Sequence, residues 1–178
     1  MNTFKIAIIA TLAALSIVTN YMLIGVSNIK LMDFIVFVGG FCFGPFAGAS
    51  IGILSWLVYG VLNPQGFAPL VWLSTMLAES IYGFVGGFLG KSIGSIDFHG
   101  QRLKLSIFFA TVGFLPTVVY DLVTNIAYAS TFNVPIVVAV FTGAPYTVLH
   151  ELANSAIFGV CSVPIVVALG KIVWRQET

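Results

Sequence analysis

Apolar stretches of about 20 residues, the length needed to cross the hydrocarbon core of a bilayer, recur along the whole chain. Of the 178 residues, 59% are hydrophobic and only 7% are charged, whereas a soluble domain carries about 25% charged residues. The sequence therefore predicts an all-α integral membrane protein. No polar segment is long enough to fold by itself, so residues 1–178 are expected to form a single transmembrane domain.

Six transmembrane helices are predicted from the apolar runs and from the turn residues between them. They cover Phe4–Ile24, Met32–Phe43, Ala47–Leu62, Leu70–Leu89, Leu105–Ala129 and Tyr146–Trp174. Gly44-Pro45 and Asn63–Pro69 are typical turn sequences, and Lys91–Lys104 is polar enough for a solvent loop. Asn133–Thr142 is too short to span, so we expect a re-entrant or interfacial piece that ends before Pro145. The glycines Gly83, Gly86, Gly87 and Gly90 predict close packing of the fourth helix against its neighbours.

The distribution of basic residues predicts the orientation of the bundle. Six crossings place both termini on one side. With the N-terminus inside, only Lys30 lies outside, and the cytoplasmic side carries Lys5, Lys91, Arg102, Lys104, Lys171 and Arg175. The positive-inside rule therefore favours an N-in, C-in topology. The expected location is the plasma membrane of a prokaryote.

Polar and ionisable residues interrupt the apolar helices at comparable depths. An acid at the centre of a membrane helix costs about 2.5–3.5 kcal/mol on insertion scales, so Glu79, Asp121 and Glu151 call for an explanation. Two ten-residue stretches share a frame, PTVVYDLVTN from Pro116 and PYTVLHELAN from Pro145. With the predicted orientation, their polar residues fall in the outer halves of the fifth and sixth helices.

These residues predict an outward-facing cup that binds a small molecule. Helical periodicity gathers the polar and aromatic groups of each helix on one face. The expected substrate-binding residues are Trp56, Tyr59, Asn63, Trp72, Glu79, Asp121, Asn125, Tyr146, His150, Glu151 and Asn154. Two alternatives remain open at this point: single members of the set could serve only as bonds between helices, and Trp72 could belong to an interfacial aromatic belt.

The chain resembles the S components of energy-coupling factor (ECF) transporters, the small membrane subunits that capture vitamins and related micronutrients. The resemblance is carried by the stretch Asn28–Pro64, which contains the turn sequence GPFAG, and by the fourth helix with its glycine-rich end. Ala10 and Ala14 supply the Ala-x-x-x-Ala spacing that the family loosely shares in its first helix.

The resemblance implies a substrate-binding subunit of an ABC-type importer. Such a subunit binds its substrate from outside, with the loop Gly25–Leu31 as a lid. It then docks through Ala10 and Ala14 on a transmembrane T component driven by two cytoplasmic ATPases, and it topples in the membrane to carry the substrate across. The chain has no Walker-type glycine loop of its own. No cofactor, metal ion or nucleic acid is expected to bind.

The sequence leaves the substrate and some rival functions open. The acids and aromatic residues would suit a cationic heteroaromatic molecule, whereas the asparagines and His150 would suit an amide-rich one. A non-transporting membrane scaffold of similar fold and a proton-coupled carrier are alternatives. An intramembrane enzyme is less favoured, because His150 and Glu151 point about 100° apart on a helix and no nucleophile or zinc motif is present.

Overall fold

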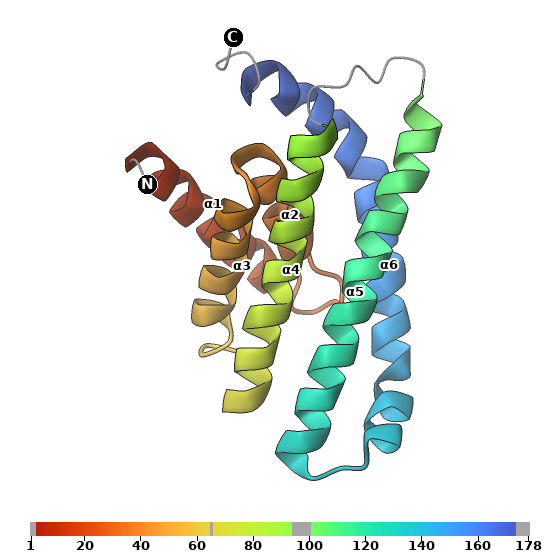
Figure 1. Cartoon of the computed structure of the whole chain (residues 1–178). Coiled ribbons are helices and arrows are strands. Elements are labelled where there is room, and N and C mark those ends of the chain that lie inside the picture. Colours follow the sequence, from red (N-terminus) through yellow and green to blue (C-terminus); the bar gives the residue numbers. More distant parts are fainter. Residues whose placement is uncertain (1–2, 65, 94–100, 174–178) are drawn as a thin grey trace.

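The computed structural model describes residues 3–64, 66–93 and 101–173, without the side chains of residues 167 and 169–173. In this part of the chain all regular elements are helices. They are α1 (Thr3–Met22), α2 (Met32–Phe43), α3 (Pro45–Tyr59), α4 (Pro69–Ile93), α5 (Arg102–Phe132) and α6 (Ile136–Val173). Figure 1 shows α5 and α6 side by side, with α4 next to α5 and with α2 and α3 packed on α4.

Four of the helices are long and apolar enough to cross a membrane, namely α1, α4, α5 and α6. The chain is therefore a multi-pass membrane protein by length and composition. Helix α2 has 12 residues and α3 has 15. At 1.5 Å per residue, α2 is about 18 Å long, short of the roughly 30 Å hydrocarbon core. Six full crossings and the N-in, C-in orientation stay predictions.

The boundary between the fifth and sixth helices differs most from the prediction. The expected separate piece at Asn133–Thr142 does not exist, because α6 begins at Ile136 and continues through Pro145 and Pro164. A proline inside a helix removes one backbone hydrogen bond. The helix can continue where neighbouring helices or side chains satisfy the carbonyl group that loses its partner. Asn133, in the left-handed conformation with φ of 53°, ends α5 instead.

The predicted solvent loop Lys91–Lys104 is also shorter at both ends. Helix α4 continues to Ile93 and α5 begins at Arg102, and residues 94–100 lie outside the described residues. Trp174, the predicted end of the sixth helix, also lies outside the described residues. The turn between α2 and α3 is confirmed. Gly44 has φ of 94°, a value that glycine adopts without strain, and Pro45 starts α3.

Glycines bring α2 and α3 into backbone contact with α4, as the sequence predicted. A Cβ atom added at Gly83 would overlap the backbone of Gly48 and Ala49 on α3. One added at Gly86 or Gly90 would overlap backbone carbonyls of α2. Small residues are the usual means of close packing between membrane helices. The short helices α2 and α3 are thus held against α4 along its glycine-rich half.

An aromatic core joins α2 to α5 and α6. Phe37 on α2 lies 6.1 Å from Phe109 and 5.0 Å from Phe158, measured between ring centroids. Each of the three side chains is at most 1% exposed. Helix α1 packs on α2 and α3, and the hydroxyls of Ser16 and Ser55 are hydrogen-bonded where α1 meets α3. The core holds together the helices that surround the main cavity.

Candidate functional site

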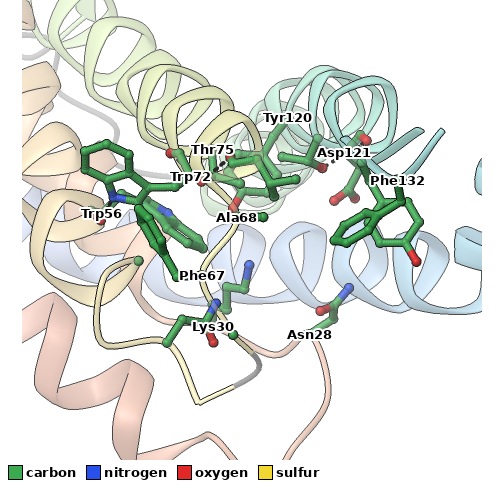
Figure 2. A pocket seen from close by; sticks show the side chains of 16 residues that line it. Asn28, Lys30, Trp56, Phe67, Ala68, Trp72, Thr75, Tyr120, Asp121 and Phe132 are labelled. Atoms are coloured by element: carbon green, nitrogen blue, oxygen red, sulfur yellow. Dashed lines mark hydrogen bonds between the residues drawn. The ribbon is translucent and has the colours of Figure 1, made fainter. Parts of the chain in front are cut away.

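A cavity of about 530 Å³ opens where the α1–α2 and α3–α4 connections meet α4 and α5 (Figure 2). In Figure 1 this region lies toward the end of the bundle where α5 joins α6, whereas α6 ends at the opposite end. Cavities of about 300–1,000 Å³ are the usual size of small-molecule sites. The aromatic side chains in its wall are Trp56, Phe67, Trp72, Tyr120, Tyr128 and Phe132. The polar ones are Asn28, Lys30, Asn63, Thr75, Asp121 and Thr124.

Two tryptophans from α3 and α4 form a fixed wall of this cavity. Trp72 Nε1 donates to the backbone carbonyl of Trp56 over 2.9 Å, and Trp56 Nε1 donates to Glu79 Oε2 over 3.1 Å. Phe67 lies 5.6 Å from Trp72 between ring centroids. A Cβ atom at Gly60 would overlap the Trp72 ring, so glycine at this position leaves room for the tryptophan. Hydrogen bonds thus hold both indole rings in place before any ligand arrives.

The α1–α2 connection supplies the opposite side of the cavity. Lys30 Nζ lies 5.5 Å from the ring centroid of Trp56 and 5.1 Å from that of Tyr120, both within cation–π range. Asn28 Nδ2 donates to the backbone carbonyl of Tyr146 on α6 over 2.9 Å. Asn28 adopts φ of 51°, a left-handed conformation that asparagine tolerates better than most residues. The side-chain bond from Asn28 therefore fastens the connection to α6.

Behind the cavity, a buried polar network joins α2, α4, α5 and α6. His150 lies 3.0 Å from Asp121 through Nδ1 and Oδ1, and 2.7 Å from Asp33 through Nε2 and Oδ2. Asn154 Nδ2 donates to Asp33 Oδ2 over 2.6 Å and to Thr117 Oγ1 over 2.8 Å. Tyr82 on α4 also donates to Thr117, over 2.8 Å. These hydrogen bonds fix the depth and the rotation of α2, α4, α5 and α6 relative to one another.

The position of His150 excludes it as an accessible base. Its side chain is 1% exposed, and each ring nitrogen faces a carboxylate oxygen. The imidazolium form satisfies this arrangement with one donated bond from each nitrogen. A general base needs a free lone pair within reach of its substrate, and His150 offers none. The geometry therefore suits a structural hub that orients two carboxylates.

Some buried carboxylate oxygens have no hydrogen-bond partner among the described residues. They are Asp33 Oδ1, Glu79 Oε1 and Asp121 Oδ2. The carboxyl groups of Asp33 and Glu79 lie within hydrogen-bonding reach of each other, and they form that bond only when one of them carries a proton. A buried acceptor without a partner costs about 1–3 kcal/mol or more. Asp121 is the one of these three acids that also lines the cavity, and it is 6% exposed. Asp121 thus places a carboxylate with one unpartnered, buried oxygen at the cavity wall.

The structure divides the sequence-predicted binding residues into three groups. Trp56, Asn63, Trp72 and Asp121 line the cavity. Behind the wall lie Tyr59, Glu79, His150 and Asn154, all buried. Outside the described lining lie Asn125, Tyr146 and Glu151. Of the last group, Asn125 donates to Thr147 over 3.5 Å, and the Tyr146 side chain is 56% exposed.

Sequence reasoning missed several residues of this site, above all Asp33. Asp33 is fully buried and bonds to two residues of α6, yet it stands alone at the start of an apolar run. Its signal was the same as that of Glu79, an acid inside a predicted membrane helix. Lys30 entered the sequence analysis only as an outside charge, and Tyr120 was not considered. Neither carries a local signal for cavity lining.

A second, smaller cavity of about 310 Å³ lies between α1 and α3. Its described lining comprises Ile6, Ile9, Ala10, Ser50, Ile53 and Leu54. Both Ala10 and Ala14, the predicted docking residues, are exposed on α1. No group of three or more His, Cys, Asp or Glu residues in the described part of the chain is arranged to hold a metal ion.

A family comparison agrees with the helical membrane architecture. Searches of curated proteins and of solved structures find no significant match. The sequence profile described as "ECF transporter, substrate-specific component" matches residues 4–173, nearly the whole chain. The family consists of transport subunits that take a small-molecule substrate and associate with a T component and ATPases. The chain thus belongs to the family of substrate-specific components of ECF transporters.

Proposed function

We propose that this S component captures a water-soluble vitamin or related micronutrient from outside a prokaryotic cell, in the cavity walled by Trp56 and Trp72. It then delivers the substrate together with a T component and two cytoplasmic ATPases. The observation that carries the proposal is the coincidence, around one cavity, of fixed aromatic walls, an ammonium group and a carboxylate of which one oxygen has no hydrogen-bond partner among the described residues. A scaffold protein would have no use for this combination.

The proposed orientation is N-in and C-in, with the cavity open to the outside. The excess of Lys and Arg on the predicted inner side supports it. The location of the cavity agrees, because its lining includes Asn28 and Lys30 of the α1–α2 connection and Asn63 of the α3–α4 connection. Both connections lie outside in that topology, so a substrate would reach the cavity directly from water.

The residues have distinct proposed roles. Trp56 and Trp72 provide flat apolar surface for ring stacking, worth about 0.5–1.5 kcal/mol per aromatic pair beyond area burial. Asp121 contacts the substrate, whereas His150, Asp33 and Asn154 position Asp121 from behind. Glu79 positions Trp56 through its indole nitrogen. The α1–α2 connection acts as the lid, with Asn28 as its fastening to α6.

The decisive experiment is capture of a substrate by the purified protein. The protein, in detergent without ATP, is incubated with yeast extract, washed and unfolded, and the released compounds are identified by mass spectrometry. At least one vitamin-class compound should be enriched over a heat-unfolded sample. Asp121→Ala should lower the retained amount at least tenfold, since hydrogen bonds to charged groups contribute about 1.5–3 kcal/mol.

The matched control is Leu122→Ala, the next residue on α5, whose side chain is 53% exposed away from the cavity. It should retain the same compound in the same amount. Absence of any enriched compound in the wild-type protein would overturn the proposal. Copurification of the chain with a T component and two ATPases, coexpressed from the same host, tests the transport part separately.

A further inference from the structure

Most hydrogen-bonding groups in the cavity wall already have partners within the protein. The indole nitrogens of Trp56 and Trp72 donate to Glu79 and to a backbone carbonyl. The hydroxyls of Thr75 and Thr124 donate to carbonyls of their own helices. Such groups recognise a ligand only at the loss of an existing bond. Of the polar groups that remain for a ligand, the two charged ones, Lys30 and Asp121, restrict its chemistry most.

Lys30 is the first of these remaining groups. Among the described residues, the ion pairs of the network are those of His150, and none joins the ammonium of Lys30 to a carboxylate. The ammonium instead lies over the rings of Trp56 and Tyr120, and its residue is partly exposed. Figure 2 shows Lys30 reaching from the α1–α2 connection toward these aromatic walls. An anionic group of a ligand would find a cation here that has no carboxylate within 4 Å among the described residues, although its charge also acts on the buried Asp33 and Glu79.

The second remaining group is Asp121. Its Oδ1 is bound by His150, whereas its Oδ2 has no partner in the described part of the chain. Because both oxygens of an ionised carboxylate only accept hydrogen bonds, a ligand group that reaches Oδ2 has to be an N–H or O–H donor. The cavity thus offers a cation on the side of the α1–α2 connection and an acceptor on α5.

The same geometry disfavours a cationic ligand. Asp33 and Asp121 share His150, and Glu79 is fully buried against Trp56, so no carboxylate is wholly free to pair with a ligand cation. A ligand cation about 5 Å from the Lys30 ammonium would lose about 300-fold in affinity at an effective dielectric constant near 20. The aromatic surface around Lys30 favours a flat ring beside the charged group.

From these contacts we infer that the substrate is a flat aromatic acid, which places a carboxylate or phosphate on Lys30 and an N–H or O–H donor on Asp121 Oδ2. The inference rests on the proposed function, because it names the chemical class of the substrate for the same cavity. An anionic substrate differs from both the cationic and the amide-rich molecule that the sequence suggested. Carboxylates and phosphates share the needed charge, and the experiment separates them by mass.

The capture experiment with yeast extract tests this inference when it is repeated on charge variants. The compound retained by the wild-type protein should carry net negative charge at pH 7 and absorb ultraviolet light above 250 nm, as an aromatic ring does. Lys30→Gln should lower its retained amount at least tenfold. Lys30→Arg, which keeps the charge and the stacking on aromatic rings, should retain most of it.

Asp121→Asn distinguishes the donor contact from simple charge. An amide can still accept through its oxygen, so a modest loss is expected, smaller than that in Asp121→Ala. Thermal unfolding of each variant, followed by tryptophan fluorescence, verifies that the protein is folded. A retained compound that is cationic, or non-aromatic, or held equally by wild type and Lys30→Gln, would overturn the inference and leave the proposed function intact. If the wild-type protein retains nothing, the proposed function fails as well.

Discussion

Replacing His150 by leucine tests whether the buried network holds charges or only ordinary interhelical bonds. His150 bonds to Asp121 over 3.0 Å and to Asp33 over 2.7 Å, and it is 1% exposed. Removing it leaves two buried carboxylates without their shared partner. Breaking a buried ion pair in this way typically costs about 3–5 kcal/mol. Two ordinary hydrogen bonds between membrane helices would cost only about 1 kcal/mol, at roughly 0.6 kcal/mol each.

The two cases predict different melting temperatures. For a chain of this size, 1 kcal/mol corresponds to about 2–4 °C, so His150→Leu should lower the melting temperature by roughly 6–20 °C. The assay is thermal unfolding in detergent without ligand, followed by near-ultraviolet circular dichroism. Glu151→Leu is the matched control, because Glu151 is partly exposed on the same helix and should change the free energy of unfolding by about 0.5 kcal/mol or less.

A double variant separates charge from packing. Adding Asp33→Asn to His150→Leu removes one of the unpaired charges, so the double variant should recover part of the lost stability. If the network were held by shape alone, the second substitution would lower stability further. A loss of 1 kcal/mol or less in His150→Leu, or a double variant less stable than the single one, would refute this account of the network.

The remaining predictions concern helix packing, the lid and the docking face. Gly83→Ala should destabilise the protein by about 1–3 kcal/mol in the same unfolding assay, because the added Cβ would overlap the backbone of α3. Gly25→Ala is the control and should be nearly neutral, because no atom lies within 4 Å of the added Cβ. Equal effects of the two substitutions would contradict this packing. Asn28→Ala removes the hydrogen bond from the lid to α6, so it should speed release of the captured compound about fivefold in a filter-binding time course. An unchanged release rate would show that this bond does not keep the lid closed. Ala10→Trp should abolish copurification with the T component while the captured compound is still retained. Leu115→Trp, on the exposed face of α5, is the control and should preserve copurification and retention of the compound. Loss of copurification in both variants would contradict the assignment of α1 as the docking face.

Local chemistry explains why several features were predictable. Glycine at positions 83, 86, 87 and 90 has no use in a helix exposed to lipid, so its repetition indicated close packing, and the structure confirms it. Gly44-Pro45 indicated the tight turn before α3 because both residues have restricted or special backbone conformations. The helix break predicted at Pro145 was wrong. This prediction, too, was based only on the conformational preference of one residue. Proline lowers helix propensity, but packing along α5 keeps α6 continuous there.

The sequence by itself determined the class of the protein and its family, because hydrophobicity, length and glycine spacing act locally and are read directly from residue order. It also drew attention to Trp56, Trp72 and Asp121 as isolated polar or aromatic groups in apolar helices. Only the tertiary structure decided which groups face the cavity and which lie behind it. Asp33 and His150 are 117 positions apart, yet they share a hydrogen bond. Contacts of that kind depend on how α2 crosses α6, which is set by packing of the whole bundle and not by any local pattern.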